Sequence, residues 1–132
     1  MRVLLIEDEP TTAKAIELML TTEGFNVYGT DLGEEGLDLG KLYDYDIILL
    51  DLNLPDMSGL DILAKIKTDD ALKRTPVVVL TTTDDKVEIQ RCYDMGCNVY
   101  ITKPVNYESF ADAIRQLGLF LSVMQIPDFD AN

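Results

Sequence analysis

Histidine and cysteine are scarce in this chain of 132 residues, and their scarcity excludes several kinds of site. There is no histidine, and the only cysteines are Cys92 and Cys97. Their spacing does not follow the paired pattern of zinc sites. A single pair of cysteines also cannot build the disulfide framework of a small secreted domain. We therefore expect reduced thiols and a cytoplasmic protein.

Cationic side chains are also few. The chain has 11 Lys and Arg against 24 Asp and Glu, for a net charge of −13. Nucleic-acid backbones and anionic lipids are bound by clustered cations, so we expect no direct nucleic-acid binding and no membrane docking. The amino-terminal stretch "MRVLLIEDE" has four consecutive apolar residues before its acids, too few for a signal peptide or a membrane span.

Apolar residues, in contrast, are plentiful enough for one core. They make up 47% of the chain, a globular composition, and the length fits one domain. The sequence shows no internal repeat and no low-complexity linker. We predict a single domain over residues 1–132, of which residues 123–132 form a tail.

Five short runs rich in apolar and β-branched residues alternate with helical patterns. Three of the runs are almost continuously apolar, which is typical of strands covered on both faces of a parallel sheet. The predicted strands are Val3–Ile6, Asn26–Thr30, Ile47–Leu50, Val77–Leu80 and Val99–Thr102.

Five helices are predicted between and after these strands. The first has Pro10 in its opening turn and ends near Gly24. Its predicted apolar face consists of Ala13, Ile16, Met19 and Leu20. The second, from about Glu34 to Leu42, is the weakest pattern, because its glycines lower helix propensity.

The other three helices have clearer patterns. One starts at Ser58, with Asp61 three residues later as in a capping box, and is expected to bury Leu60, Leu63 and Ile66. The next runs from about Asp85 to Met95 and stops at Gly96. The last begins near Asn106, and its apolar residues are Phe110, Ala113, Ile114, Leu117 and Leu121.

Strands and helices alternating in this way predict a doubly wound α/β fold with a five-stranded parallel sheet and five helices. The common strand order for such a fold is 2-1-3-4-5. Ligands bind beyond the carboxyl ends of strands one and three, where the winding direction reverses.

Polar residues follow several of these strands at that edge. Glu7 and Asp8 follow the first strand and Asp51 the third. Three carboxylates this close repel one another unless a cation holds them, and oxygen ligands suit Mg²⁺. Thr81 and Lys103 end the fourth and fifth strands, so the set suits phosphoryl transfer onto Asp51, with Thr81 and Lys103 holding phosphate oxygens.

Each of these residues also has an ordinary structural interpretation. Asp51 could be a turn or cap residue, and Glu7 and Asp8 a solvated acidic turn. Thr81 could simply be a good strand former and Lys103 a surface lysine. The joint occurrence of all five at one edge favours the functional interpretation.

The motifs "LLIEDEP", "IILLDLNLPDMSGLD", "PVVVLTT" and "YITKP" resemble those of two-component response-regulator receiver domains, the flavodoxin-like signalling family. The resemblance covers almost the whole chain. It implies that Asp51 is the phosphoacceptor. It also implies that Asp8, Asp51 and the main-chain carbonyl of Asn53 ligate Mg²⁺, and that Glu7 acts largely through water.

The same resemblance assigns roles to residues at the other strand ends. Thr81 and Lys103 would contact the phosphoryl group, and Tyr100 matches the aromatic switch position. A cis peptide bond is expected before Pro104. Asn53 and Thr83 fall where such domains tune the lifetime of the phosphoryl group. The expected output surface is formed by helix four, strand five and helix five.

The two halves resemble different subfamilies. Residues up to about Leu60 are similar to receivers of alphaproteobacterial cell-cycle regulators. Residues from Thr75 onward are similar to stand-alone receivers that work with bacteriophytochrome kinases. No effector domain follows, so the chain is either a natural single-domain regulator or a chimera. Because it lacks histidine, the phosphoryl donor must be another protein, a sensor histidine kinase or a histidine phosphotransfer protein.

Three other functions compete with this one. A phosphatase that uses an aspartyl-phosphate would need a second acid where Asn53 stands. A flavodoxin-like cofactor binder would need a phosphate-binding loop, but "EDEPTT" is acidic and has no glycine. A purely structural interaction module with a vestigial site would take no phosphodonor label.

The stretch "LGLFLSVMQIP" has more apolar residues than one helix face can bury. The surplus predicts a homodimer whose interface is formed by the last helix and the tail, with a contribution from the fourth helix. The predicted dimer face consists of Ile89, Leu119, Phe120, Val123 and Met124. A tail that folds back over its own domain, or that binds the kinase, is the alternative.

Overall fold

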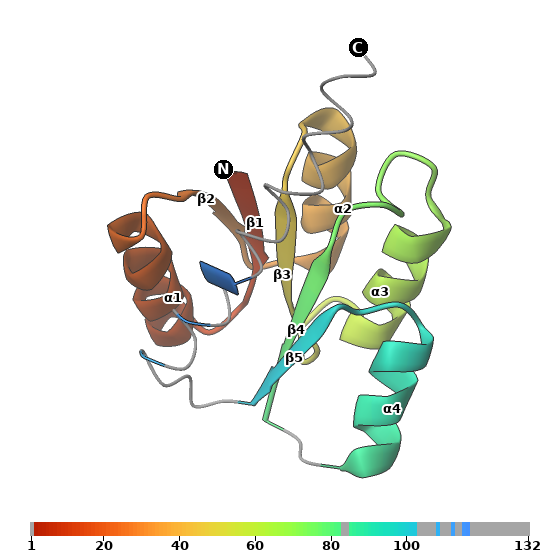
Figure 1. The fold of residues 1–132 in the computed structure, drawn as a ribbon. Coiled ribbons are helices and arrows are strands. Elements are labelled where there is room, and N and C mark those ends of the chain that lie inside the picture. The colour runs from red at the N-terminus through yellow and green to blue at the C-terminus, as the bar shows by residue number, and fades with distance from the viewer. Residues whose placement is uncertain (1, 83–84, 103–107, 109–111, 113–114, 117–132) are drawn as a thin grey trace.

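Five parallel strands form one sheet in the computed structural model, which describes residues 2–82, 85–102, 108, 112, 115 and 116 (Figure 1). The order β2-β1-β3-β4-β5 is the predicted one. The strands are β1 (Arg2–Ile6), β2 (Asn26–Thr30), β3 (Ile47–Asp51), β4 (Val77–Thr81) and β5 (Val99–Thr102). β3 and β4 each run one residue further than predicted, so Asp51 and Thr81 belong to the strands themselves.

Four helices connect these strands within the described residues. They are α1 (Pro10–Thr22), α2 (Gly33–Leu42), α3 (Gly59–Thr68) and α4 (Lys86–Asp94). The predicted fifth helix, from about Asn106 to Leu121, falls mainly outside that part of the chain. No helix among the described residues has both the length and the apolar composition needed to cross a bilayer.

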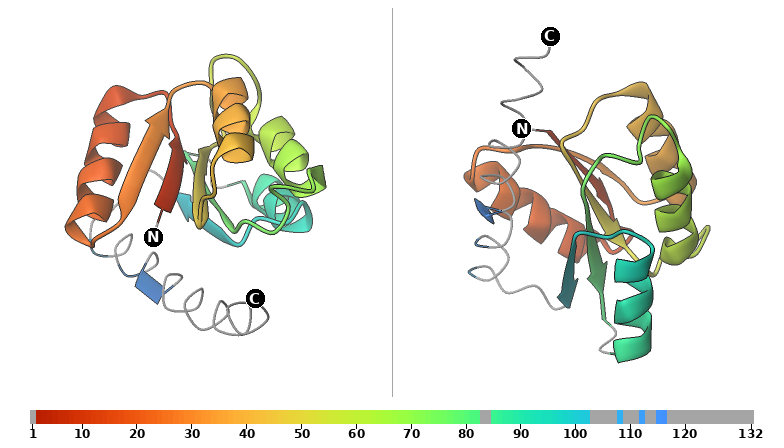
Figure 2. Two further views of the ribbon diagram at one scale, coloured as in Figure 1. Left: turned by 90° about the horizontal axis from the view of Figure 1, so that it is seen from above. Right: turned by 45° about the vertical axis from the view of Figure 1, so that its right-hand side comes forward.

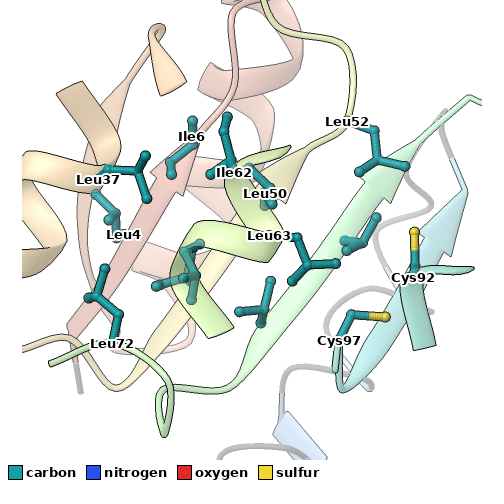
Figure 3. Packing of buried hydrophobic residues seen from close by; sticks show 14 residues of the cluster. Leu4, Ile6, Leu37, Leu50, Leu52, Ile62, Leu63, Leu72, Cys92 and Cys97 are labelled. Carbon is teal, nitrogen blue, oxygen red and sulfur yellow. The ribbon is translucent and has the colours of Figure 1, made fainter. Parts of the chain in front are cut away.

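The sheet separates two apolar layers. α1 covers one face, and α2, α3 and α4 cover the other (Figure 2, left). Alternate residues of the central strands therefore point into different clusters, and β1, β3 and β4 are buried along almost their whole length. This arrangement confirms the prediction that continuous apolar runs are strands covered on both sides. Figure 3 shows the larger cluster, in which Ile62 and Leu63 of α3 pack near Leu50 of β3.

The helix boundaries follow from local capping. The Glu9 carboxylate accepts hydrogen bonds from the amides of Thr11 (3.1 Å) and Thr12 (2.6 Å) at the start of α1. A bond from the Thr12 hydroxyl, and then the two amide bonds, lower the pKa of Glu9. α4 is capped by the Asp85 side chain and ends before Gly96, whose φ of +102° favours glycine.

The glycines of α2 explain why this helix forms despite a weak sequence pattern. Its buried positions include Gly33, Gly36 and Gly40. A Cβ atom at Gly36 would lie 2.5 Å from a methyl carbon of Ile6, so a side chain there would force Ile6 or the helix to shift. Packing against β1 therefore compensates for the low helix propensity.

One predicted core face is partly wrong. In α3 the buried apolar residues are Ile62, Leu63 and Ile66, whereas Leu60 is only half-buried. The reason is Gly59, which packs directly against the backbone of Leu52. This contact turns the Gly59 side of the helix toward the sheet and moves Leu60 toward the flank.

Candidate functional site

Three carboxylates meet at the carboxyl edge of the sheet. Glu7 and Asp8 follow β1 directly, and Asp51 is the last residue of β3. Ile6 lies opposite Leu50 in the strand register, so the acids one position further along are neighbours. The oxygen atoms that the three residues offer lie within 4.8 Å of one another. The structure thus brings together the acids that the sequence places at this edge.

Burial makes this cluster costly without a cation. Glu7 is 3% and Asp51 1% exposed, whereas Asp8 is open to solvent. Carboxylates held this close repel one another, and burial strengthens the repulsion. A small divalent cation with a preference for oxygen relieves it. Mg²⁺ fits this donor set, because it usually takes one or two carboxylates, keeps several waters and engages a phosphate.

The loop after β3 holds the Asp51 side chain in place. The amide of Asn53 donates a hydrogen bond of 3.1 Å to Asp51 Oδ1. Asn53 also forms an isolated bridge with Ser58, which closes the loop before α3 begins. The Leu52 amide donates to the carbonyl of Leu80 on β4 (3.0 Å), so the strand pairing continues past Asp51. The Asn53 amide therefore orients the carboxylate, and the bond to Leu80 anchors the main chain that follows Asp51.

Thr81 and Tyr100 lie on the strands next to this site. Thr81 ends β4 and is 1% exposed, one position beyond the Leu80 that lies opposite Asp51. Tyr100 on β5 lies opposite Val79. Since side chains alternate along a strand, Thr81 and Tyr100 share a face of the sheet, the one covered by α2, α3 and α4. Tyr100 is half-buried and packs against that layer.

The remaining predicted residues are placed as follows. Asn53 is exposed at the site. Ile89 is half-buried on α4, which is distant in sequence from Glu7, Asp8 and Asp51. The other predicted site and dimer residues lie outside the described residues; they are Thr83, Lys103, Pro104, Leu119, Phe120, Val123 and Met124.

Sequence reasoning missed a pocket beside the carboxylates. A cavity of about 520 Å³ is lined by Glu7 and Asp8 together with Glu17 of α1, Asp31 after β2 and Glu35 of α2. Asp31 follows its strand just as Glu7 follows β1, so the same rule of strand ends could have found it. The signals for Glu17 and Glu35 are weaker, because both are exposed acids within helices and neither follows a strand.

A further missed residue is Asp56, in the loop between Asp51 and α3. Its carboxylate accepts hydrogen bonds from the amides of Gly33 (2.9 Å) and Glu34 (3.0 Å), the first residues of α2. The bond from Glu34 and then that from Gly33 lower the pKa of Asp56. α2 has no cap of its own, because the residue before it is Leu32. The loop of the candidate site therefore caps a neighbouring helix.

A comparison with sequence families gives one assignment for most of the chain. Residues 3–115 match the family model of the response regulator receiver domain. The cell cycle transcriptional regulator CtrA of Caulobacter vibrioides is 48% identical over an alignment that covers 100% of this chain and 58% of that regulator. The chain therefore spans little more than half the length of this relative. The expectation of no nucleic-acid binding finds no support here, since the relative is a transcriptional regulator.

Solved structures agree with the sequence match. A response regulator receiver domain from Rhodospirillum rubrum is 49% identical, with a TM-score of 0.77 over 95% of this chain and 96% of that one. The phosphorylated cyanobacterial phytochrome response regulator RcpA is 33% identical, with a TM-score of 0.77 over 91% of this chain and 92% of that one. The predicted division of the chain into two differently related halves is not tested by these matches.

Proposed function

Because the chain belongs to the response regulator receiver family, we propose that it is a phosphorylation-controlled signalling domain in which Asp51 accepts the phosphoryl group. The single observation that carries this proposal is the position of Asp51, buried at the end of β3 between Glu7, Asp8 and the strand that ends in Thr81. The amide of Asn53 donates a hydrogen bond to Oδ1 of Asp51 and so helps to orient the carboxylate that would act as the nucleophile.

In the transfer step an Asp51 oxygen attacks the phosphorus atom of a phosphohistidine. The new P–O bond forms as the P–N bond breaks, and the imidazole nitrogen that leaves takes up a proton. The donor is a sensor histidine kinase or a histidine phosphotransfer protein, since this chain has no histidine of its own. The domain catalyses only its own phosphorylation and dephosphorylation and transforms no separate substrate.

Asp8, Asp51 and the main-chain carbonyl of Asn53 would hold Mg²⁺, with Glu7 acting through water. The fit rests on the cluster of hard oxygen donors and on the burial of two of its three carboxylates. The ion supplies charge neutralisation for the phosphoryl oxygens. We assign Thr81 and Lys103 as phosphoryl contacts, the latter before a cis bond to Pro104, and Asn53 and Thr83 as residues that tune the lifetime of the phosphorylated state.

The output surface in this proposal is the face of α4, β5 and the predicted fifth helix. Thr81 and Tyr100 share one face of the sheet on adjacent strands, so an inward shift of the Thr81 hydroxyl makes room for the Tyr100 ring. This change has two discrete packing states, as a switch requires. Its readout would reach Ile89 on α4, the helix beside β5.

We also propose that the whole chain is one receiver domain and that it pairs with a second copy through Ile89 and the apolar residues Leu119, Phe120, Val123 and Met124. Burying a few such side chains per subunit is worth about 1.5–3 kcal/mol each, enough to offset part of the cost of association. Sedimentation equilibrium of wild type and of Phe120→Asp/Met124→Asp tests this. A monomeric wild type, phosphorylated or not, would refute it.

The phosphoacceptor is tested with acetyl phosphate or a phosphorylated kinase as donor. Asp51→Asn should take up no label, because the amide cannot form the acyl phosphate. Asp61→Asn is the matched control, since Asp61 is an exposed acid at the start of α3, and it should label like wild type. Equal labelling of Asp51→Asn and wild type would contradict the assignment of Asp51 and point to another acceptor. A wild type that takes up no label from either donor would favour the purely structural module.

A further inference from the structure

Tyrosine rings surround the Arg2 side chain at the end of the sheet opposite the acids. The guanidinium carbon lies 5.0 Å from the ring centre of Tyr28 on β2, 5.3 Å from that of Tyr45 and 5.9 Å from that of Tyr43. The rings of Tyr28 and Tyr45 meet edge to face, with centres 5.7 Å apart. The three rings hold the cation in one place through contacts with their π-faces.

This arrangement borders an open cavity of about 570 Å³, which we call the Arg2–tyrosine pocket. Its lining consists of Arg2, Val27, Tyr28, Gly29, Leu39, Tyr43 and Tyr45. Tyr28 and Tyr43 remain 43% and 52% exposed. Arg2 is the one charged residue in this lining, and within the described residues its guanidinium makes no ion pair. The pocket thus combines exposed aromatic surface with hydrogen-bond donors for an anion.

The pocket is remote from Asp51. Arg2 begins β1 and the acids follow its end, so about 16 Å of strand separates the two sites. Tyrosine and arginine are also the residues that dominate binding energy in protein interfaces. The composition therefore fits a peptide segment with an aromatic ring and carboxylates.

The chain itself contains such a segment. Its last residues include Asp128, Phe129 and Asp130, an aromatic ring between two carboxylates. We propose that this segment docks in the Arg2–tyrosine pocket of its own chain, with the Phe129 ring against Tyr28 and Tyr43 and a carboxylate on the Arg2 guanidinium. On a protein of net charge −13 an acidic segment is repelled from most of the surface, which favours this cationic pocket.

The segment is long enough to reach it. Arg115 pairs with Glu23, its Nη2 lying 2.8 Å from Oε1 and its Nε 3.2 Å from Oε2. Glu23 lies just before β2, and Asn26 at the start of β2 is opposite Arg2. Residue 115 is therefore held at the same edge of the sheet as the pocket. If the predicted last helix ends at Leu121, the seven residues to Asp128 still span about 24 Å when extended.

The absence of tryptophan allows a direct test on the full chain. Phe129→Trp supplies a single reporter, whose emission should be shifted to shorter wavelength because the ring is shielded. Adding Arg2→Gln should move the emission toward that of an indole in water, and so should adding Asp128→Asn/Asp130→Asn. Arg74→Gln, which removes the same charge from an exposed residue outside the pocket, should leave it unchanged.

A second measurement leaves Phe129 in place. The Tyr28 and Tyr43 ring resonances should differ between wild type and Asp128→Asn/Asp130→Asn, with little change at Tyr93, which is exposed on α4. Tyr43→Ala in the Phe129→Trp protein should also release the reporter and does not depend on the folding of an Arg2 variant. The loss of a charge-assisted contact should lower the docked-to-free ratio about tenfold.

Three results would overturn the proposal. The first is a tryptophan emission in the Phe129→Trp protein that already matches an indole in water. The second is a shorter-wavelength emission that neither Arg2→Gln nor Tyr43→Ala changes. The third is a shift to shorter wavelength that increases with protein concentration. The last would mean that the segment docks on a second copy. Circular dichroism of each variant confirms that the fold is retained.

Discussion

Gly59 lies so close to the end of β3 that a Cβ atom added there would come within 2.8 Å of the Asp51 carbonyl oxygen. The same atom would meet the backbone of Leu52 even more closely. Backbone cannot rotate away as a side chain can, so the start of α3 or the end of β3 would have to shift. The candidate phosphoacceptor therefore depends on the absence of a side chain eight residues later.

Gly59→Ala is expected to lower stability by about 1–3 kcal/mol, as overpacking does in a tight core, and to slow phosphorylation by displacing Asp51. Urea unfolding and labelling rates measure the two effects. Gly29→Ala is the control, because the nearest atom to its added Cβ is 4.0 Å away. If Gly59→Ala and Gly29→Ala had the same stability and the same labelling rate, the close approach of Gly59 to β3 would not matter for folding or phosphorylation.

Millimolar Mg²⁺ should raise the melting temperature relative to NaCl of the same ionic strength. Binding to the folded state alone stabilises by about 2.7 kcal/mol when the free ion is 100-fold above its dissociation constant. Asp8→Asn should reduce this response, because it removes a donor from the cluster. Asp31→Asn should keep it, since Asp31 lines the neighbouring pocket but is outside the cluster. A response equally weakened in both variants would point to general screening.

Asp56→Ala should lower the melting temperature by a few degrees at neutral pH, because α2 loses the acceptor for the amides of Gly33 and Glu34. Asp38→Ala removes an exposed acid from the same helix and should have a smaller effect. Hydrogen exchange at the two amides should quicken only in Asp56→Ala. Unchanged exchange at both would show that the bonds contribute nothing in solution.

The same bonds predict a pH dependence. They lower the pKa of Asp56 in the folded state, below an unfolded value of about 3.9. The stabilisation is therefore fully present above the unfolded pKa and is lost as the pH falls through the folded pKa. The difference in melting temperature between wild type and Asp56→Ala should be constant from neutral pH to about pH 5 and shrink in stronger acid. A difference in melting temperature that grows as the pH falls would contradict the lowered pKa of Asp56.

Thr81→Ala should separate phosphorylation from its readout. Asp51 would still take up the label, whereas the beryllofluoride-induced shift of the Tyr100 ring resonances should disappear, because the hydroxyl that couples the two is gone. Thr82→Ala, one residue further along and exposed, is the matched control. A Tyr100 shift of wild-type size in Thr81→Ala would exclude this route.

The strands and their order could be read from the sequence because each strand is a short apolar run covered on both sides. The same rule placed Glu7, Asp8 and Asp51 at one edge, since parallel strands end together. Boundaries of α1 and α4 were also predictable, because Pro10, Gly24 and Gly96 mark them by their backbone preferences.

Contacts between distant segments could not be predicted in this way. The rotation of α3 follows from the contact of Gly59 with Leu52, which exists only once β3 and α3 are packed. The cap on α2 comes from Asp56, 22 and 23 residues away in the chain, and no local pattern marks it. The tyrosines around Arg2 are likewise spread over β2 and the connection between α2 and β3.

The pairing of β1 with β3 also has a kinetic meaning. Ile6 and Leu50 are opposite each other but lie 44 positions apart, with β2 and two helices between them. Closing such a loop has an entropic cost, which slows the pairing. Parallel pairing of this kind therefore forms late in folding. The acid cluster does not exist before that step, and a partly folded chain cannot bind the ion or accept a phosphoryl group. Magnesium should consequently slow unfolding far more than it speeds refolding, and a kinase would act only on chains that have finished folding.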